Sequence, residues 1–196
     1  MTISILGSGN IGSALARRFA AKTLTVSLAN SRGPGSLEAL IDELGPHIHA
    51  VDLEQALQAD MVILAVPFKG VPDLAQKANW TGRIVVDATN AIDLPGFTPT
   101  DLGGKLSSEV VTETLKGARV VKAFNTLPAA ILGKDPEEAA GRRVIFLSGD
   151  DPEARASVNA LAESLGFAPI DLGSLAAGRP QQFGEPLVVR NLLLQS

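Results

Sequence analysis

The 196-residue sequence contains no cysteine and no tyrosine, and it has only two histidines. Without cysteine, disulfides, thiolate metal sites and dithiol redox chemistry are excluded. Without tyrosine, the Tyr–Lys pair with which short-chain dehydrogenases protonate a carbonyl oxygen is excluded as well. His47 and His49 fall on an expected edge strand, where structural or solvated roles are expected. The usual groups for acid–base catalysis are therefore scarce.

Long hydrophobic runs and excess positive charge are also missing. The longest apolar segments have the length of a strand, as in residues 61–66, so no membrane-spanning helix is predicted. The formal net charge of −4 argues against nucleic acid or an anionic membrane as partner. The chain begins directly with a predicted strand rather than a basic and apolar leader, so we expect a cytoplasmic protein.

The segments that are present alternate between strands and helices. Strands are predicted at 2–6, 24–29, 47–51, 61–66, 83–87, 119–123, 143–148 and 168–172. Helices are predicted from residue 11 onward, at 36–44, 53–58, 70–78 and 107–116, after 125, and from 152 to Gly166, with a long loop at 88–105. This order predicts one α/β domain over residues 1–196: a Rossmann-type, doubly wound, mainly parallel sheet with helices on both faces.

The most specific motif lies between the first strand and the first helix. It reads Gly7-Ser8-Gly9-Asn10-Ile11-Gly12. In this context Gly7 allows a tight turn, Gly9 lets the backbone approach phosphates, and Gly12 lets the helix pack on the strand. The free N–H groups of the helix N-terminus attract an anion. The motif predicts a dinucleotide pyrophosphate site, with an ordinary glycine turn as the alternative.

The end of the second strand indicates which dinucleotide fits. A site for NAD needs a carboxylate there for the ribose hydroxyls. Here Asn30, Ser31 and Arg32 follow the strand, and the first acidic residue of the chain is Glu38. A guanidinium binds a 2′-phosphate through two hydrogen bonds, and Ser31 can add another. The sequence predicts NADP(H), with a solvated loop arginine as the alternative.

Three more segments stand at the carboxyl ends of predicted strands and form a candidate hydride-transfer cleft. They contain Val66, Pro67 and Phe68, then Asn90, then Asn125 to Ala129 with Pro128. Pro67 and Phe68 flank the nicotinamide or form a plain turn with a core Phe. Asn90 bonds the cofactor or caps its loop. The third segment joins an amide and a hydroxyl to a helix start, which suits a ring carbonyl.

The scarcity of acid–base groups favours hydride exchange between two bound heterocycles, which needs mainly stacking, exclusion of water and hydrogen bonds to the ring edge. Lys122 and Glu109 are the alternative proton donors. Without a second domain, the substrate site is built from loops or by a homodimer. Two other functions stay open: a small imine or carbonyl dehydrogenase with an acid from a dimer partner, and a non-catalytic NADPH-binding sensor.

Several motifs occur together in a recognisable order. They are the loop from Gly7 to Gly12, Ser31-Arg32, Val66-Pro67-Phe68, Phe124 to Ala130, Gly149-Asp150-Asp151 and Asp171 to Leu175. Over nearly its whole length the chain resembles the NADP-dependent oxidoreductases related to archaeal NADPH:coenzyme F420 oxidoreductase. It is also similar to the cytosolic domain of STEAP-type metalloreductases, which use NADPH and flavin.

The resemblance implies NADP(H) as cofactor, with F420, FMN or FAD as the second, small-molecule redox partner. It implies that the NADP phosphates are held by residues matching Ser8, Asn10, Ile11, Ser31 and Arg32. Residues matching Pro67 and Phe68 then lie near the nicotinamide, the segment 125–129 faces the second ring, and 173–179 helps to close that site. Residues 107–196 thus complete the second-cofactor cleft. Asn125 departs from the archaeal pattern, where we expect His, and is closer to the STEAP-like one, so deazaflavin and flavin both stay open.

Overall fold

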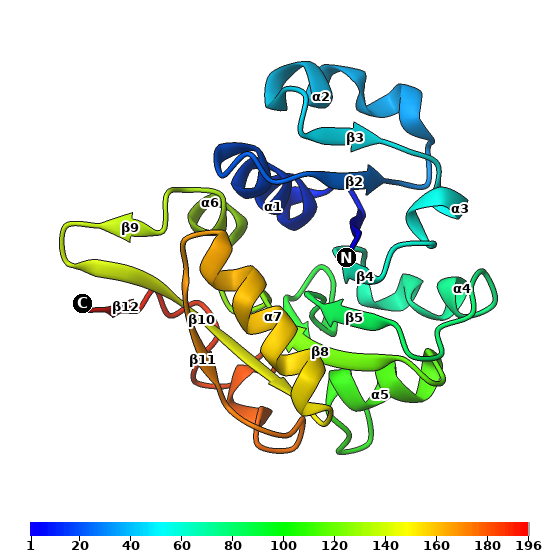
Figure 1. The fold of residues 1–196 in the computed structure, drawn as a ribbon. Coiled ribbons are helices and arrows are strands. Elements are labelled where there is room, and N and C mark those ends of the chain that lie inside the picture. The colour runs from blue at the N-terminus through cyan, green and yellow to red at the C-terminus, as the bar shows by residue number, and fades with distance from the viewer. Residues whose placement is uncertain (196) are drawn as a thin grey trace.

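The computed structural model describes residues 1–195, in which ten strands form the main sheet (Figure 1). The strand order is β11-β10-β8-β5-β4-β1-β2-β3, with β9 and β12 also paired to β10. The strands are β1 (Ile3–Leu6), β2 (Val26–Ala29), β3 (Ile48–Ala50), β4 (Met61–Leu64), β5 (Ile84–Asp87), β8 (Arg119–Ala123), β9 (Glu137–Glu138), β10 (Gly141–Gly149), β11 (Ala168–Asp171) and β12 (Leu193–Leu194).

The six strands from β3 to β8 along this order are parallel. β10 runs antiparallel to β8, with Leu147 opposite Ala123, and β11 runs parallel to β10. The chain leaves β1 toward β2 and β3, and then returns to β4 on the other side of β1. This reversal opens a crevice at the carboxyl ends of β1 and β4, which is where ligands bind in such sheets.

Helices cover both faces of the sheet, and Figure 1 shows α1 and α7 on one side with α3, α4 and α5 on the other. The helices are α1 (Asn10–Ala21), α2 (Glu38–Leu44), α3 (Leu53–Ala56), α4 (Pro72–Ala75), α5 (Ser107–Thr114), α6 (Ala129–Leu132) and α7 (Pro152–Ser164). Alternate strand residues face the two layers: Ile63 packs with the cluster under α1 and α7, and Val62 with the cluster under α3, α4 and α5. The predicted fold class is confirmed.

Asp52 and Asp151 cap the N-termini of α3 and α7, because their carboxylates accept the N–H groups of Gln55 and Ala154, each at 2.7 Å. Both caps place a short polar side chain where the first-turn amides have no partner. No helix among residues 1–195 is long and apolar enough to cross a membrane.

The structure differs from the sequence prediction where elements are short. The helix predicted at 70–78 is a 3-10 turn, η2 (Phe68–Gly70), followed by the single turn of α4, because Pro72 starts a helix but cannot continue one. The loop predicted at 88–105 contains a hairpin of β6 (Ile92–Asp93) and β7 (Thr98–Pro99). Two-residue strands such as these, β9 and β12 are too short to show an alternating pattern.

Candidate functional site

The glycine loop is held by close backbone packing at two positions. Gly7 has a φ of 108°, and a Cβ there would lie 2.3 Å from the carbonyl oxygen of Ala65. A Cβ on Gly12 would lie 1.8 Å from the carbonyl oxygen of Gly7. Gly9 differs, since a Cβ at that position would meet no atom within 4 Å. The loop is therefore tight beneath and open above Gly9, as a pyrophosphate site requires.

The first turn of α1 faces this opening without a cap. Gly9 is the N-cap residue, no side chain bonds the first-turn amides, and no acidic residue occurs in that turn. Free N–H groups and the positive end of the helix dipole therefore point toward the opening. Ser13 Oγ instead donates to the carbonyl oxygen of Ser8 at 3.0 Å, which fixes the loop on the helix.

Asn30 organises the loop after β2. Its Nδ2 donates to Ser8 Oγ and to Ser36 Oγ, each at 2.9 Å, and its Oδ1 accepts the Arg32 N–H at 2.9 Å. These bonds tie the glycine loop to the β2 loop and leave the side chains of Ser31 and Arg32 exposed. Sequence reasoning had not assigned Asn30 a role, although it stands where a carboxylate is found in NAD sites.

A cavity of about 430 Å³ lies between the ends of β1, β2 and β4. It brings together seven of the predicted cofactor-binding residues, namely Gly7, Ser8, Gly9, Ser31, Arg32, Val66 and Pro67. It also contains a carboxylate that sequence reasoning missed: Asp73 of α4 lines the same cavity, together with Lys77. No signal in the sequence marks Asp73, because a carboxylate of a nucleotide site is expected after β2 and Asp73 comes after β4.

The remaining members of the predicted set lie around this cavity. Ile11 is half-buried against the core, and Asn10 lines a neighbouring cavity. Phe68 is half-buried in the apolar cluster under α4 and α5 and lines a separate cavity of about 90 Å³. Of the two residues predicted to flank a nicotinamide, only Pro67 therefore lines the cavity at the ends of β1, β2 and β4.

Asn90 and Asn125 form a reciprocal pair that joins the ends of β5 and β8. Asn90 Nδ2 donates to the carbonyl oxygen of Asn125 at 2.8 Å, and Asn125 Nδ2 donates to Asn90 Oδ1 at 3.0 Å. Asn125 Nδ2 also donates to the carbonyl oxygen of Gln181 at 2.7 Å. Asn125 is 3% exposed, whereas Pro128 at the start of α6 is exposed.

Beneath this pair lies a fully buried ion pair between Lys122 and Asp87, which stand opposite one another on β8 and β5. Lys122 Nζ donates to Asp87 Oδ2 at 2.9 Å, to the carbonyl oxygen of Thr89 at 2.6 Å and to Ser107 Oγ at 3.2 Å. All three ammonium protons thus have partners. Lys122 is a structural cation rather than a free proton donor.

The other alternative acid is also engaged. Glu109 Oε2 accepts the N–H of Leu106 at 2.8 Å at the start of α5. The two histidines lie at β3, which is the edge strand beyond β2, as expected from the sequence. The predicted acid–base candidates thus lie in capping, core or edge positions.

The C-terminal segment closes over β8 through two glutamines that sequence reasoning missed. Gln181 is fully buried and donates to Ser148 Oγ, and Gln182 Oε1 accepts from Ser107 Oγ at 2.6 Å. Val189 N–H donates to the carbonyl oxygen of Thr126 at 2.7 Å. Residues beyond the expected segment 173–179 therefore hold the loop that carries Asn125.

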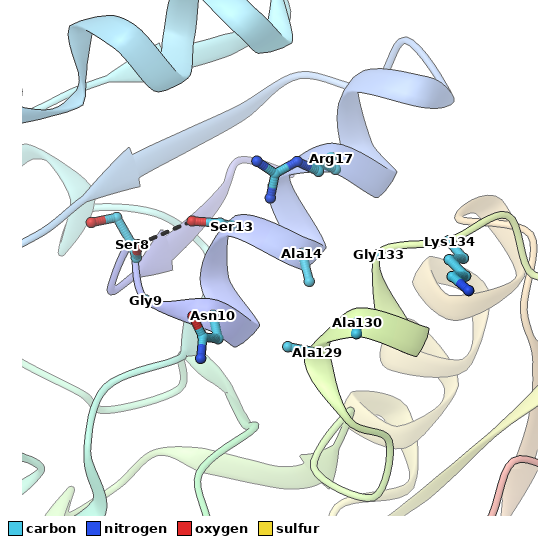
Figure 2. A pocket seen from close by; sticks show the side chains of 10 residues that line it. All are labelled: Ser8, Gly9, Asn10, Ser13, Ala14, Arg17, Ala129, Ala130, Gly133 and Lys134. Atoms are coloured by element: carbon cyan, nitrogen blue, oxygen red, sulfur yellow. Dashed lines mark hydrogen bonds between the residues drawn. The ribbon is translucent and has the colours of Figure 1, made fainter.

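A second cavity, of about 660 Å³, lies between α1 and α6 and meets the first at Ser8 and Gly9. Figure 2 shows the small side chains of Ala14, Ala129 and Ala130 in its middle, with Arg17 on α1 and Lys134 after α6 on either side.

These features define a class: an α/β protein with a dinucleotide-binding crevice. Residues 2–91 match the family model described as NADP oxidoreductase, coenzyme F420-dependent. The crystal structure of a hypothetical protein from Sinorhizobium meliloti is similar over 100% of this chain and 96% of that one, with 56% identity and a TM-score of 0.97.

Two further relatives carry functional names. A provisionally assigned F420-dependent NADP reductase from an Arthrobacter species has a TM-score of 0.75 and 28% identity, over 91% of this chain and 87% of that one. Metalloreductase STEAP3 from Rattus norvegicus is 29% identical over 90% of this chain and 35% of that protein. The chain spans about a third of the length of the STEAP relatives it matches. The chain is thus similar to the NADP-dependent oxidoreductases that include these reductases, and the family model covers residues 2–91 of its 196.

Proposed function

We propose that the protein transfers a hydride between NADPH and a flavin or deazaflavin ring. The observation that carries this proposal is the open glycine loop with the uncapped α1 N-terminus, next to an exposed Arg32 in a loop that has no carboxylate from residue 30 to 35. The name of the Arthrobacter relative, an F420-dependent NADP reductase, supports the same class of reaction, and STEAP3 is named as a reductase too.

The residues present fit the phosphates of NADP(H). The first-turn amides of α1 hold the pyrophosphate above Gly9, where a Cβ would meet no protein atom within 4 Å. Arg32 and Ser31, which Asn30 holds at the cavity edge, bind the 2′-phosphate. The carboxylate of Asp73 and the ammonium group of Lys77 both line this cavity.

Hydride transfer is the chemistry that NADPH supplies when bound: two electrons leave with the hydride, and the ring that is reduced takes its proton from solvent. The Asn90–Asn125 pair fixes the loop that ends at Pro128, so the exposed Pro128 presents a rigid surface beside α6. Because Lys122 and Glu109 have other partners, a reaction without a protein acid fits this cleft.

The acceptor class is tested by mixing the protein with NADPH and following its absorbance after addition of FMN, riboflavin or oxidised F420. We expect NADPH to be consumed with at least one of these ring compounds. Turnover with a panel of carbonyls and imines but with no ring compound would replace the proposal by a small dehydrogenase. Binding of NADPH without any turnover would replace it by a sensor.

The nucleotide assignment is tested separately with Arg32→Ala. Loss of a charged hydrogen bond should weaken NADPH binding about 10- to 100-fold, whereas NADH binding should not change. Arg190→Ala is the matched control, because Arg190 is exposed and its Nε donates to a carbonyl oxygen of the C-terminal segment. Equal losses for NADPH and NADH in Arg32→Ala would contradict the 2′-phosphate assignment.

A further inference from the structure

The cavity between α1 and α6 is larger than the nucleotide site requires. Its α1 wall is formed by Asn10, Ser13, Ala14 and Arg17, which recur at helical spacing on one face. These residues span about 10 Å along the helix axis. A pyrophosphate bound to the first-turn amides occupies only the end at Ser8 and Gly9, where the two cavities meet. About two turns of α1 remain for another ligand.

The opposite wall is made of small residues. A Cβ on Gly133 would lie 3.4 Å from the Cβ of Ala14, an ordinary van der Waals distance, so the end of α6 lies close to α1 at this point. Ala129 and Ala130 line the rest of this wall. Figure 2 shows these small side chains on the facing parts of α1 and α6.

The charges of this cavity have one sign. None of its lining residues is acidic, and Arg17 and Lys134 are both cationic. Arg17 uses Nε and Nη2 to bind Glu43, at 2.9 and 3.1 Å, which leaves its Nη1 for another acceptor. Lys134 is exposed and makes no ion pair within residues 1–195. Its neighbour Asp135 lies 3.6 Å from the guanidinium of Arg18 instead.

The position of α6 links this cavity to the proposed second ring. α6 begins at Ala129, directly after the segment from Asn125 to Pro128 that the proposed function sets against that ring. A chain that leaves the ring at Pro128 and follows α6 passes Ala129 and Gly133 and reaches Lys134. The cavity therefore begins one residue beyond Pro128 and extends to two cationic side chains.

Resting on the proposed function, we infer that the cavity between α1 and α6 binds the anionic tail of the second ring cofactor. Lys134 and Arg17 contact the phosphate or carboxylates of that tail, and the small residues of α6 accommodate its polyol chain. The site therefore selects ring compounds with an anionic tail over the same ring with a neutral one.

Binding by the NADP⁺-loaded protein tests this without turnover. The probes are FMN and riboflavin, and F420 with the deazaflavin parent that keeps the neutral ribityl chain but lacks the anionic groups, each followed by the change in its fluorescence. We expect the tailed member of at least one pair to bind about tenfold more tightly, with a preference that decreases as salt is added. Equal binding within both pairs, or binding of none of the four compounds, would overturn the inference.

Lys134→Gln should remove most of the preference for the compound with the anionic tail. It should leave the affinity for riboflavin and for the deazaflavin parent unchanged. Lys116→Gln is the matched control, because Lys116 is an exposed lysine after α5, outside this cavity. Preserved discrimination in Lys134→Gln and Arg17→Gln would overturn the assignment to this cavity.

If the tail preference is found but no ring is reduced, the proposed function fails and the inference stands. If the rings are reduced but FMN binds no more tightly than riboflavin, and F420 no more tightly than its parent, the proposed function stands and the inference fails.

Discussion

The two sides of the crevice use their polar groups in opposite ways. On the nucleotide side, formed by the glycine loop and residues 30–32, the first-turn amides are uncapped and Arg32 is exposed. On the network side, formed by the ends of β5 and β8, Lys122 and Asn125 are buried and bonded to other protein groups. The first side keeps its bonding capacity for a ligand. The second uses most of its own to fix the loops, although Asn125 Oδ1 and Gln181 Oε1 have no partner among residues 1–195. Substitutions should therefore affect binding on one side and stability on the other.

The largest expected effect is on the network side. Lys122→Met leaves the buried Asp87 carboxylate without its cation, which should lower the free energy of unfolding by about 3–5 kcal/mol. Urea unfolding followed by circular dichroism measures this loss. The double variant Lys122→Met/Asp87→Leu should recover much of it, because no unpaired charge remains. A single variant within about 1 kcal/mol of wild type, as expected for the exposed Lys116→Met, would show that the ion pair does not hold this side.

The two sides also differ in how far the sequence predicted them. Gly7 to Gly12 act through local geometry, so their spacing between a strand and a helix was sufficient. The Lys122–Asp87 pair depends on the register of two strands whose residues lie 35 positions apart. The only available signal was a charged residue in each of two apolar strands. Gln181 and Gln182 gave no signal, because they lie in a segment without periodicity.

The overall fold could be predicted because each long strand and helix carries its own pattern of apolar residues. The reversed direction of β10 could not be predicted, because an apolar strand reads the same way in parallel and antiparallel pairings. The residues that line each cavity could not be predicted from the sequence either. Asp73 and Lys77 come to the first cavity from the segment after β4, and Arg17 and Lys134 line the second from α1 and from the end of α6, so the packing of these elements against the glycine loop decides what each cavity contains.

A glycine pair on the nucleotide side separates packing from binding. Gly12→Ala should cost about 1–3 kcal/mol of stability, because its Cβ would overlap the carbonyl oxygen of Gly7. Gly9→Ala should leave stability unchanged, since its Cβ meets no atom within 4 Å. Both variants should lose most of their NADPH affinity, measured by titration calorimetry. Unchanged NADPH binding in Gly9→Ala would place the pyrophosphate elsewhere.

Asn30→Asp should change nucleotide preference with little effect on stability. A carboxylate at this position repels a 2′-phosphate but accepts hydrogen bonds from ribose hydroxyls. The hydroxyls of Ser8 and Ser36, which accept hydrogen bonds from Asn30 Nδ2, can donate to the new carboxylate instead. The loop should therefore keep its shape. We expect NADPH affinity to fall about tenfold and NADH affinity to rise, both measured by the same titration. A parallel loss for both nucleotides would indicate a collapsed loop instead.

The smallest expected effect lies on neither side, at the amino ends of β1 and β4. The N–H and hydroxyl groups of Thr2 donate to Asp60 Oδ2 at 2.7 and 3.0 Å and hold the pKa of that carboxyl below its ordinary value. A lowered pKa in the folded state stabilises the fold above the unfolded-state pKa of about 4, and this contribution is lost as the pH falls through the folded value. Asp60→Asn should therefore lower the melting temperature slightly at pH 7, with a difference from wild type that shrinks as the pH is lowered below about 4. Since Asp60 is remote from the crevice, NADPH affinity should not change. A melting difference that is the same at both pH values would show that the charge of Asp60 contributes nothing, and a loss of NADPH affinity would show that this edge of the sheet is coupled to the site.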